Sequence, residues 1–556
     1  MKLHWIVSAL AITAASHAMA QDDAPAPEGP AERERIFPSF DVWFPEEVFA
    51  EPVSGRLIIY MISDDAPIGR GMSPVRGPFM DSAQPMFGVD VKDLKPGEHL
   101  IVNDANSLGC PVTLNDLQEG GYRVQMLLDV QRNASDWREE TGHLMSGVHR
   151  VYFNGPDGIK DNPAVPDFEF PIDFRLGRVW QPSPESTVGL FEYMHVKSEI
   201  LSEFWGHDFE LSVAVIPPVG LDNGKKYPAI YQVPGFGGTH KDGYRFARMR
   251  SQNPGFNIVL NRSAYRIVIN PEGPNGHNLC ADSENNGPVA RAIIEELIPA
   301  LEAKYPLIAK PEARVLEGHS SGAWSSIWLA MNYPDTFGGA WASAPDPVDF
   351  RAFQIGNIYE DDNLYVRDDE VVPAFRRNGE PIYSVALENG YEEVMGPDNS
   401  SGQQWDSWQG VFGPKGANGH PAALYNAGTG VIDHDIAEQY RKYDIAYQLR
   451  EAPEKFGPIF KNNIRVRVGD MDSYYLNNAV ELLKASLEDA GYLGAAQEWG
   501  GYVEIEPRLD HSTINDFDWH ARMGEEMVAH FKKFEVMPTR ADGDGADPDA
   551  GETDPE

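Results

Sequence analysis

A serine between two glycines is the first feature of this sequence that could do chemistry. Ser320 lies in the pentapeptide G-H-S-S-G, after the apolar pair Val-Leu and before an apolar run typical of a helix. A serine hydroxyl becomes a nucleophile when a histidine takes its proton and a carboxylate orients that histidine. Such a serine must project from the end of a strand on a turn too tight for flanking side chains, so glycine is needed two residues before and after it. The motif predicts Ser320 as a nucleophile; the alternative is an ordinary turn serine.

Two later motifs could supply the partners of this serine. The apolar run IRVRV is followed by GDMD, which offers Asp470 and Asp472 as the acid. The run YVEIEP is followed by RLDHSTIND, which offers His511 as the base, whereas the neighbouring Asp510 is expected to be a solvated loop acid. An imidazole with a pKa of about 6.5 can take the serine proton and return it to the leaving group. Asp472 is the preferred acid and Asp470 the alternative, because either could instead cap the following helix.

A glycine-rich loop could supply part of an oxyanion hole. The apolar run IYQV leads into PGFGGTH, whose glycines allow the backbone to approach a substrate closely. The first turn of a helix also offers unpaired N–H groups. We therefore expect the backbone N–H groups of Phe236 and Ser321 to stabilise a developing oxyanion, the alternative being an ordinary glycine-rich turn. The sequence assigns no residue to substrate binding.

The elements that must position these residues alternate between strand and helix patterns. Strand-like runs such as PAIYQV, YRIVI and IRVRV are separated by runs with helical spacing, of which VARAIIEELIPALEAKY is the clearest. This alternation predicts a mostly parallel sheet with helices on both faces, and the order serine, acid, histidine is that of the α/β-hydrolase fold. We place this catalytic domain at residues 191–537. The alternation lapses at 346–463, a segment with Trp405 and Trp408 that we expect to form a large insertion capping the active site.

The segments before and after this domain differ in composition. Residues 37–190 contain short alternating runs separated by turn residues and no long helical pattern, which predicts a small antiparallel β-domain, sandwich-like in form. Residues 1–20 have the charge, apolar centre and A-M-A ending of a signal peptide, so we expect export to the periplasm or secretion. Residues 21–36 read as a flexible leader and residues 538–556 as a disordered acidic tail.

Charge and cysteine usage exclude several classes of partner. The chain has 46 basic and 85 acidic residues, a net charge of −39, which argues against nucleic acid or an anionic membrane surface as a partner. After the signal, no apolar run approaches the roughly 18 residues that span a bilayer. Cys110 and Cys280 are expected to be two isolated buried thiols, although export would permit a disulfide. The histidines show no metal-ligand spacing, and we expect no metal and no cofactor.

Several segments together resemble one family. YPAIYQVPGFGG, CADSENNGP, GHSSGAWSSIWLAMNYPDTF, GDMD and DHSTINDFDW are similar, in this order, to motifs of the esterase D or "putative esterase" family of α/β-hydrolases, whose relatives include feruloyl esterases, enterochelin esterases and mycolyltransferases. The resemblance extends from about Val196 to Val536, outside most of the insertion. It implies Asp472 as the acid and His511 as the base. Pro234 stands where the family often has histidine, and Asp510 where it often has glycine.

These observations predict an exported serine hydrolase that cleaves carboxylic esters through Ser320, His511 and Asp472. The substrate would be a small-molecule or glycan ester. Two alternatives remain open at this point. The same triad could transfer the acyl group to a hydroxyl acceptor instead of water, as in an acyltransferase. The chain could also be a catalytically silent protein that binds a glycan or a partner on a hydrolase scaffold, because the aromatic residues of the insertion could stack on sugar rings.

Overall fold

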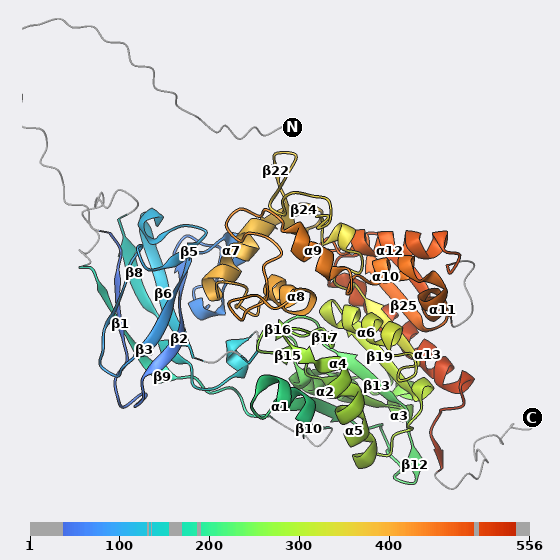
Figure 1. Ribbon diagram of the computed structural model, residues 1–556. Coiled ribbons are helices and arrows are strands. Elements are labelled where there is room, and N and C mark those ends of the chain that lie inside the picture. The colour runs from blue at the N-terminus through green and yellow to red at the C-terminus, as the bar shows by residue number, and fades with distance from the viewer. Residues whose placement is uncertain are drawn as a thin grey trace, which may run out of the picture.

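Two large β-sheets and a helical region between them make up the protein in the computed structural model (Figure 1). The signal peptide and leader predicted at residues 1–36 lie outside the residues that the structure describes. The described residues are 37–130, 133–134, 136–154, 169–185, 191–493 and 500–540.

The C-terminal sheet has eight strands in the order β10-β11-β14-β13-β19-β20-β25-β26. Its last six strands all pair in parallel, while β10, β11 and β14 pair antiparallel. This mixed sheet and its helices form an α/β-hydrolase-like fold, in which the parallel strands end at one edge. The strands are β10 (Glu192–Lys197), β11 (Glu210–Ile216), β13 (Ala229–Val233), β14 (Tyr265–Ile269), β19 (Arg314–His319), β20 (Gly339–Ser343), β25 (Ile464–Gly469) and β26 (Tyr502–Glu506).

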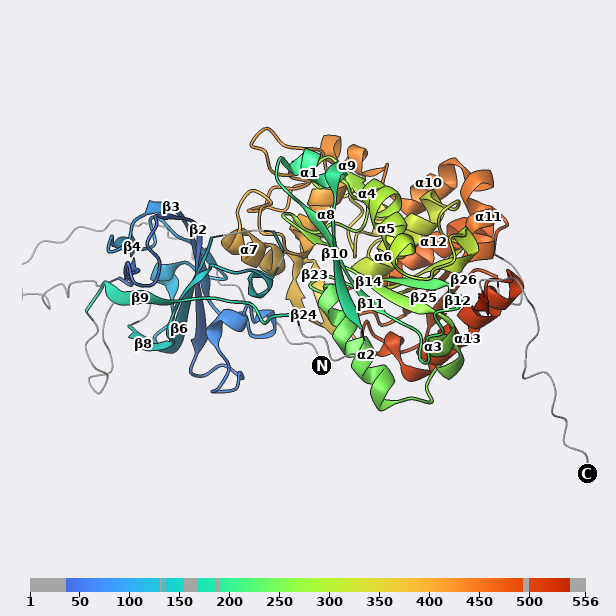
Figure 2. The same ribbon diagram turned by 90° about the horizontal axis from the view of Figure 1, so that it is seen from below.

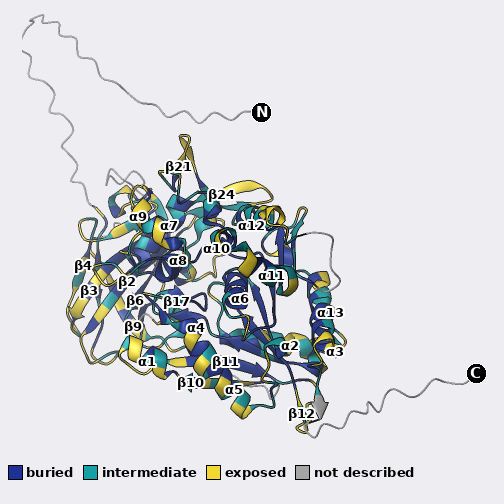
Figure 3. Cartoon of the chain, turned by 45° about the vertical axis from the view of Figure 1, so that its right-hand side comes forward, coloured by how far each residue is buried: buried dark blue, intermediate teal, exposed yellow. Residues whose placement is uncertain are grey.

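Helices pack on both faces of this sheet, because its central strands are apolar along their whole length. One face is covered by α1 (Glu199–Trp205), α4 (Val289–Ala292), α5 (Ile298–Lys304), α6 (Ser321–Asn332), α11 (Pro453–Asn463) and α12 (Asn477–Asp489). The other face is covered by α2 (Gly243–Gln252), α3 (Ile258–Ser263) and α13 (Phe517–Lys533). The long helix expected near 289–305 contains a π-helical turn, Ile293–Leu297, between α4 and α5. Figure 3 shows α6 and the sheet strands beside it as the most buried part of the molecule.

The segment 346–463 lies between β20 and β25 and is mainly helical. Its aromatic side chains, among them Trp405, Trp408 and Phe412, belong to the same apolar core as α6. The elements are η8 (Phe350–Ala352), β21 (Val366–Arg367), β22 (Glu370–Val371), β23 (Pro373–Arg377), β24 (Glu380–Ser384), α7 (Val385–Met395), α8 (Gln404–Phe412), α9 (His434–Tyr440) and α10 (Ile445–Glu451), followed by α11. The hairpin β21–β22 projects into solvent (Figures 1 and 3).

The N-terminal sheet has the order β4-β1-β9-β7-β6-β2-β3-β5, with β8 paired to β6. Its pairs are antiparallel except β1 and β9, which run in parallel. The alternating residues of its strands enclose an apolar core of their own. The strands are β1 (Phe40–Trp43), β2 (Val53–Ser63), β3 (Met86–Leu94), β4 (Leu100–Val102), β5 (Leu108–Cys110), β6 (Gly120–Asp129), β7 (Leu144–Ser146), β8 (His149–Phe153) and β9 (Ile172–Val179).

Helix α7 lies between the N-terminal sheet and the rest of the molecule in both views (Figures 1 and 2). The Arg56 Nε donates to the carbonyl oxygen of Val394 at 3.0 Å, and the Tyr391 hydroxyl donates to that of Gln84 at 2.6 Å. Apolar side chains of β2, β3 and β6 form one buried cluster with Tyr391, Val394 and Met395. The segment 346–463 and the N-terminal sheet therefore share a core.

Short elements complete the described chain. Both cysteines are buried free thiols, as the sequence predicted. The strand β27 (Thr539–Arg540) pairs with β12 (Lys225–Lys226), so the first residues of the segment predicted as a tail form a strand, and the rest of that segment lies outside the described residues. Within the described ranges, no helix has the length and apolar character needed to cross a membrane. The remaining strands are β15 (Glu272–Gly273), β16 (Gly276–His277), β17 (Asp282–Ser283) and β18 (Gly287–Pro288).

Candidate active site

Ser320 occupies a strained turn between β19 and α6. Its backbone angles are φ 58° and ψ −127°, a conformation that a residue with a side chain rarely adopts. Glycine is required on both sides: a Cβ at Gly322 would lie 2.0 Å from the Val233 carbonyl oxygen, and one at Gly318 would lie 2.0 Å from that of Gly322. Strain of this kind persists only where the surrounding structure enforces it, and it is found most often at functional sites. The turn therefore presents the Ser320 hydroxyl at the carboxyl edge of the sheet.

The imidazole of His511 and the carboxylate of Asp472 are in direct contact. Nδ1 of His511 lies 2.8 Å from Oδ2 of Asp472. The other carboxylate oxygen accepts the backbone N–H groups of Tyr474 and Leu476, at 2.9 and 3.2 Å, which fixes the orientation of the carboxylate. Asp472 is fully buried, and His511 and Ser320 both line one cavity. A hydrogen bond from Nδ1–H to the carboxylate leaves Nε2 of His511 as the proton acceptor.

Asp470, the alternative acid, makes a different contact. Its Oδ1 accepts the backbone N–H of Arg508 at 2.5 Å, and its own N–H donates to the Glu506 carbonyl oxygen at 2.9 Å. These bonds join the end of β25 to the loop after β26. Asp510 stabilises its own loop, since its Oδ1 accepts hydrogen bonds from the backbone N–H groups of Ser512 and Thr513. The geometry therefore favours Asp472 over Asp470 as the partner of His511.

Opposing effects set the protonation of His511. Burial disfavours the charged imidazolium, but the carboxylates of Asp472, Asp346 and Asp510 outweigh it and raise the pKa of His511 above its ordinary value. His319 has its ring centroid 4.6 Å from that of His511. Burial, together with the charge on His511, lowers the pKa of His319 to about 3. His319 is therefore neutral near pH 7, and His511 is the histidine of this pair that can carry a proton.

The loop after β13 lies against the nucleophile turn. A Cβ at Gly235 would lie 3.0 Å from the His319 carbonyl oxygen and 3.2 Å from the Ser320 Cβ, so glycine fits this close approach without displacing its neighbours. Phe236 follows in the lining of the cavity that contains Ser320. Ser321 is the first residue of α6, where a backbone N–H has no acceptor within its own helix. The two N–H groups expected to form an oxyanion hole thus belong to segments that meet at Ser320.

Asp346 is a site residue that the sequence analysis missed. It follows β20, the strand beside that of the nucleophile, and is 1% exposed. The Ser320 hydroxyl donates to its Oδ1 at 3.4 Å, and Trp408 Nε1 donates to its Oδ2 at 2.7 Å. Burial raises the pKa of Asp346 above its ordinary value. The sequence did contain a signal for Asp346, because this aspartate closely follows the apolar strand that comes after the nucleophile motif.

The cavity at Ser320 holds about 580 Å³ and has two different sides. The sheet edge contributes Ser320, His511 and the Gly235–Gly238 loop. We call the opposite side the far wall, and define it by Met80, Gln354, Tyr383, Glu388, Glu392, Met395 and Gln404. Met80 belongs to η2 (Met80–Ser82), which is part of the N-terminal region, and the other far-wall residues belong to the segment 346–463. The N-terminal region therefore reaches the cavity of the nucleophile.

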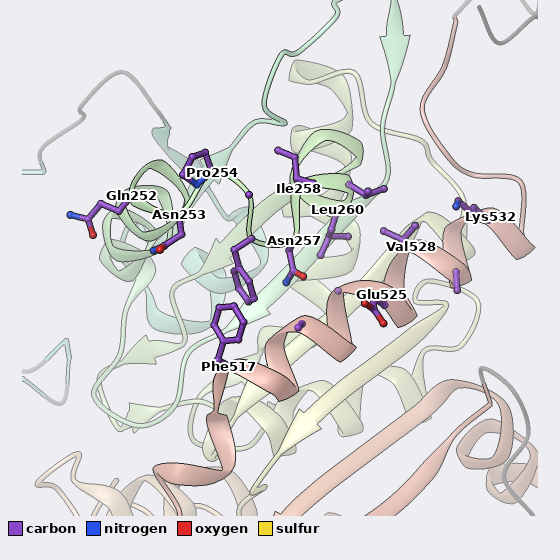
Figure 4. Close-up of a pocket in the computed structure, with 16 residues that line it drawn as sticks. Gln252, Asn253, Pro254, Asn257, Ile258, Leu260, Phe517, Glu525, Val528 and Lys532 are labelled. Atoms are coloured by element: carbon purple, nitrogen blue, oxygen red, sulfur yellow. The ribbon is translucent and has the colours of Figure 1, made fainter. Parts of the chain in front are cut away.

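A larger cavity, of about 890 Å³, lies elsewhere in the molecule. It opens between the residues around α3 and the outer face of α13, with Phe517 and Ile258 among its apolar lining (Figure 4). The rings of Phe256 and Phe517 lie 4.3 Å apart at its end. Ser320, Asp472 and His511 do not line it. Its lining offers no arrangement of a nucleophile and a base, so the smaller cavity is the candidate active site.

Part of the chain matches the sequence model of a known family. Residues 207–411 match the model of the family described as "Putative esterase". The resemblance predicted from the motifs is confirmed. This match supports ester hydrolysis as the activity at the level of the family, and a comparison with curated proteins found no match.

Solved structures similar to the chain include three hydrolases. A ferulic acid esterase is 13% identical, with a TM-score of 0.36 over 62% of this chain and 97% of its own. FphF, a fluorophosphonate-binding serine hydrolase of Staphylococcus aureus, is 12% identical, with a TM-score of 0.34 over 61% of this chain and 97% of its own. An S-formylglutathione hydrolase from Agrobacterium tumefaciens is 14% identical, with a TM-score of 0.33 over 62% and 94%.

Proposed function

We propose that the protein is an exported serine hydrolase that cleaves carboxylic esters, with Ser320 as nucleophile, His511 as base and Asp472 as the acid that orients the base. The observation that carries the proposal is the 2.8 Å contact between His511 and Asp472 at the cavity that Ser320 also lines. The strained turn at Ser320 supports it independently, because the protein maintains an unfavourable backbone conformation at that one hydroxyl.

The reaction follows from these positions in two steps. In the first, Nε2 of His511 takes the Ser320 proton while Oγ attacks the ester carbonyl. The resulting oxyanion accepts hydrogen bonds from the N–H groups of Phe236 and Ser321. The ester C–O bond then breaks, and the His511 imidazolium gives its proton to the leaving alcohol. In the second step, His511 takes a proton from water, which attacks the acyl-enzyme. The bond between the acyl carbon and Ser320 Oγ then breaks, His511 returns the proton to Oγ, and the acid is released.

The proposal includes a division of labour along the chain. Residues 191–537 would be the catalytic domain, with 346–463 as a cap over the nucleophile, and residues 37–190 an N-terminal β-domain that packs against α7. The far wall supports the cap, because most of its residues come from 346–463. The signal-like pattern at residues 1–20 supports export to the periplasm or beyond.

Hydrolysis of p-nitrophenyl acetate tests the proposal. The purified protein is expected to release nitrophenol, and Ser320→Ala is expected to lower kcat by about 10⁴-fold or more, with an unchanged circular dichroism spectrum. Ser512→Ala is the matched control, since this exposed serine lies beside His511 in the same loop. Equal loss of activity in both variants, or full activity in Ser320→Ala, would refute the assignment.

A further inference from the structure

The far wall contains amide groups that the protein itself leaves unpaired. Gln354 is 2% exposed, and its Oε1 is buried with no hydrogen-bond partner in the described structure. Its backbone has φ 61°, a left-handed conformation that is unfavourable for glutamine. Nε2 of Gln404 is likewise buried without a partner among the described residues. Because buried polar groups are normally paired, an orphaned acceptor and an orphaned donor at one cavity indicate a ligand that both accepts and donates hydrogen bonds.

A buried carboxyl group lies beside these amides. Glu388 is 5% exposed, and its Oε2 accepts Trp405 Nε1 at 3.2 Å. Burial raises the pKa of Glu388 to about 7. At pH 7 its carboxyl is therefore protonated in about half of the protein molecules, and in that form it can donate a hydrogen bond as well as accept one. Glu392, one turn further along α7, accepts the backbone N–H groups of Trp405 and Asp406 at 3.0 Å and thereby caps α8. Glu388 and Glu392 both line the cavity, and Glu392 in addition holds the start of α8.

Part of this polar group is tied to the segment that follows Asp472, beside His511. The ring of Tyr474, in the loop after Asp472, meets that of His511 edge-on with centroids 4.9 Å apart. Tyr474 and Glu388 both line the cavity of Ser320. The carbonyl oxygen of Gln354 accepts Asn478 Nδ2 at 3.0 Å, which ties Gln354 to α12 just beyond the same loop. Since His511 must protonate the leaving oxygen, the leaving alcohol occupies this side.

The ionisable residues that line the cavity limit which functional groups the leaving alcohol can carry. Asp346, Glu388 and Glu392 are buried in its lining, and Arg245 is the one lysine or arginine among the described lining residues. The Arg245 side chain is 82% exposed and pairs with Asp242 at 3.5 Å, so it lies at the mouth. A carboxylate or phosphate on the alcohol would find no buried lysine or arginine to pair with among the described lining residues. An apolar alcohol would leave the two amides unpaired.

We propose that Gln354, Glu388 and Gln404 form a subsite for an alcohol that carries several hydroxyl groups and no anionic group, and that this alcohol is the leaving group of the ester. The inference depends on the proposed function, because it assigns one half of the same substrate. Hydroxyl groups can donate to Gln354 Oε1, accept from Gln404 Nε2 and do either at the Glu388 carboxyl. The bond changes remain those of ester hydrolysis, with the alcohol taking its proton from His511.

Three acetate esters of similar size test the subsite with the full-length protein. They are methyl glucopyranoside 6-acetate, cyclohexylmethyl acetate and acetylcholine, which share the acyl group and differ in the alcohol. The kcat/KM for the sugar ester is expected to exceed that for the cyclohexylmethyl ester by about 10-fold or more, because a site built for hydroxyl groups rejects an analogue that lacks them. A preference for the apolar or the cationic ester, or no preference, would overturn the inference.

Two variants test whether the far wall causes the preference for the sugar ester. Gln404→Leu and Gln354→Leu are each expected to reduce the sugar-to-cyclohexylmethyl ratio by about 10-fold. Gln439→Leu, at an exposed position of α9, is the matched control and should leave the ratio unchanged. If Gln354→Leu does not fold, because its left-handed backbone tolerates little change, Gln404→Leu decides the matter. An unchanged ratio in Gln404→Leu would contradict the role of the wall.

The outcome separates the inference from the proposed function. Hydrolysis of p-nitrophenyl acetate without any preference among the three acetates would overturn the subsite and leave the serine hydrolase intact. Absence of hydrolysis of every ester would overturn the proposed function. Competitive inhibition of p-nitrophenyl acetate hydrolysis by methyl glucopyranoside, weakened in Gln404→Leu, would support the subsite by binding alone, and failure to inhibit at high concentration would count against it.

Discussion

The two sides of the candidate active site are built in different ways. On the sheet edge, each reactive group follows a strand: Ser320 follows β19, Asp472 follows β25 and His511 follows β26. On the far wall, side chains come from α7, from α8, from β24, from the turn after η8 and, in the case of Met80, from the N-terminal region. The sheet edge is thus positioned by regular hydrogen bonding between neighbouring strands, and the far wall by side-chain packing between parts distant in sequence.

This difference indicates which side sets the chemistry and which sets the substrate. The strand ends are held by the parallel pairing of β19, β20, β25 and β26, so the distances between reactive groups are fixed by the sheet itself. The far wall depends on the shared core between α7 and the N-terminal sheet. We therefore expect changes on the sheet edge to alter the rate for every ester, and changes on the far wall to alter the preference among esters.

The largest expected effect comes from exchanging one of two nearby acids on the sheet edge. Asp472→Asn should lower kcat/KM for p-nitrophenyl acetate by about 10³- to 10⁴-fold, since the amide cannot hold His511 in the required tautomer. Asp470→Asn is the matched control, because its carboxylate binds the Arg508 N–H instead. Steady-state kinetics on both variants decides between them. The reverse pattern would transfer the role of acid to Asp470.

The next effect concerns the contact between α7 and the N-terminal sheet. At Gly88 a Cβ would lie 2.1 Å from the Val394 carbonyl oxygen and 2.5 Å from Arg56 Nη2. Gly88→Ala should therefore lower the free energy of unfolding by about 1–3 kcal/mol in chemical denaturation. Gly71→Ala, where no heavy atom lies within 4 Å, should have little effect. Equal stabilities for the two variants would mean that this contact does not form in solution.

A smaller effect is expected for the one far-wall residue that the N-terminal region supplies. Met80→Ala enlarges the cavity, so the ratio of kcat/KM for p-nitrophenyl hexanoate to that for the acetate should rise by about 3- to 10-fold. Met72→Ala, at a position 39% exposed in the same region, is the control. Comparison of the two ratios checks the result. No change in Met80→Ala would remove the N-terminal region from the substrate site.

The smallest expected effect is a shift in the pH dependence of kcat/KM. His511 must be neutral to take the Ser320 proton, so kcat/KM should fall as the pH drops below the pKa of His511. The carboxylate of Asp346 helps to raise this pKa, and Asp346→Asn removes that negative charge. The acidic limb of the pH profile should therefore move to lower pH. Asp435→Asn, at an exposed position, should not move it; a shift to higher pH in Asp346→Asn would contradict the electrostatic account.

The sequence predicted the sheet edge better than the far wall for a physical reason. A nucleophile turn needs its glycines at fixed spacing, and the acid and base must follow strands, so short motifs identify Ser320, Asp472 and His511 as candidates. The α/β-hydrolase-like fold follows from the same alternation of strands and helices. The parallel pairing of β1 and β9 has no such local signal, because it joins the first and the last strand, in chain order, of the N-terminal sheet.

The far wall has no comparable signal in the sequence. Gln354, Gln404 and Met80 acquire a role only from tertiary packing, since no spacing rule joins a methionine of the N-terminal region to two glutamines of the insertion. The aromatic residues of the insertion suggested a sugar-stacking surface, whereas Trp405 and Trp408 are buried in the core beside α6. Burial of this kind depends on the whole fold and cannot be read from a short motif.

The most direct test of the account is the site at which a fluorophosphonate reacts. After incubation of the full-length protein with the probe, peptide mass spectrometry should find the phosphonyl group on Ser320, and its attachment should slow markedly in His511→Ala. Because ordinary serines are unreactive without an activating base, labelling at this residue alone would show that the hydroxyl is activated. Absence of labelling in well-folded protein, or labelling at another serine, would contradict the central claim.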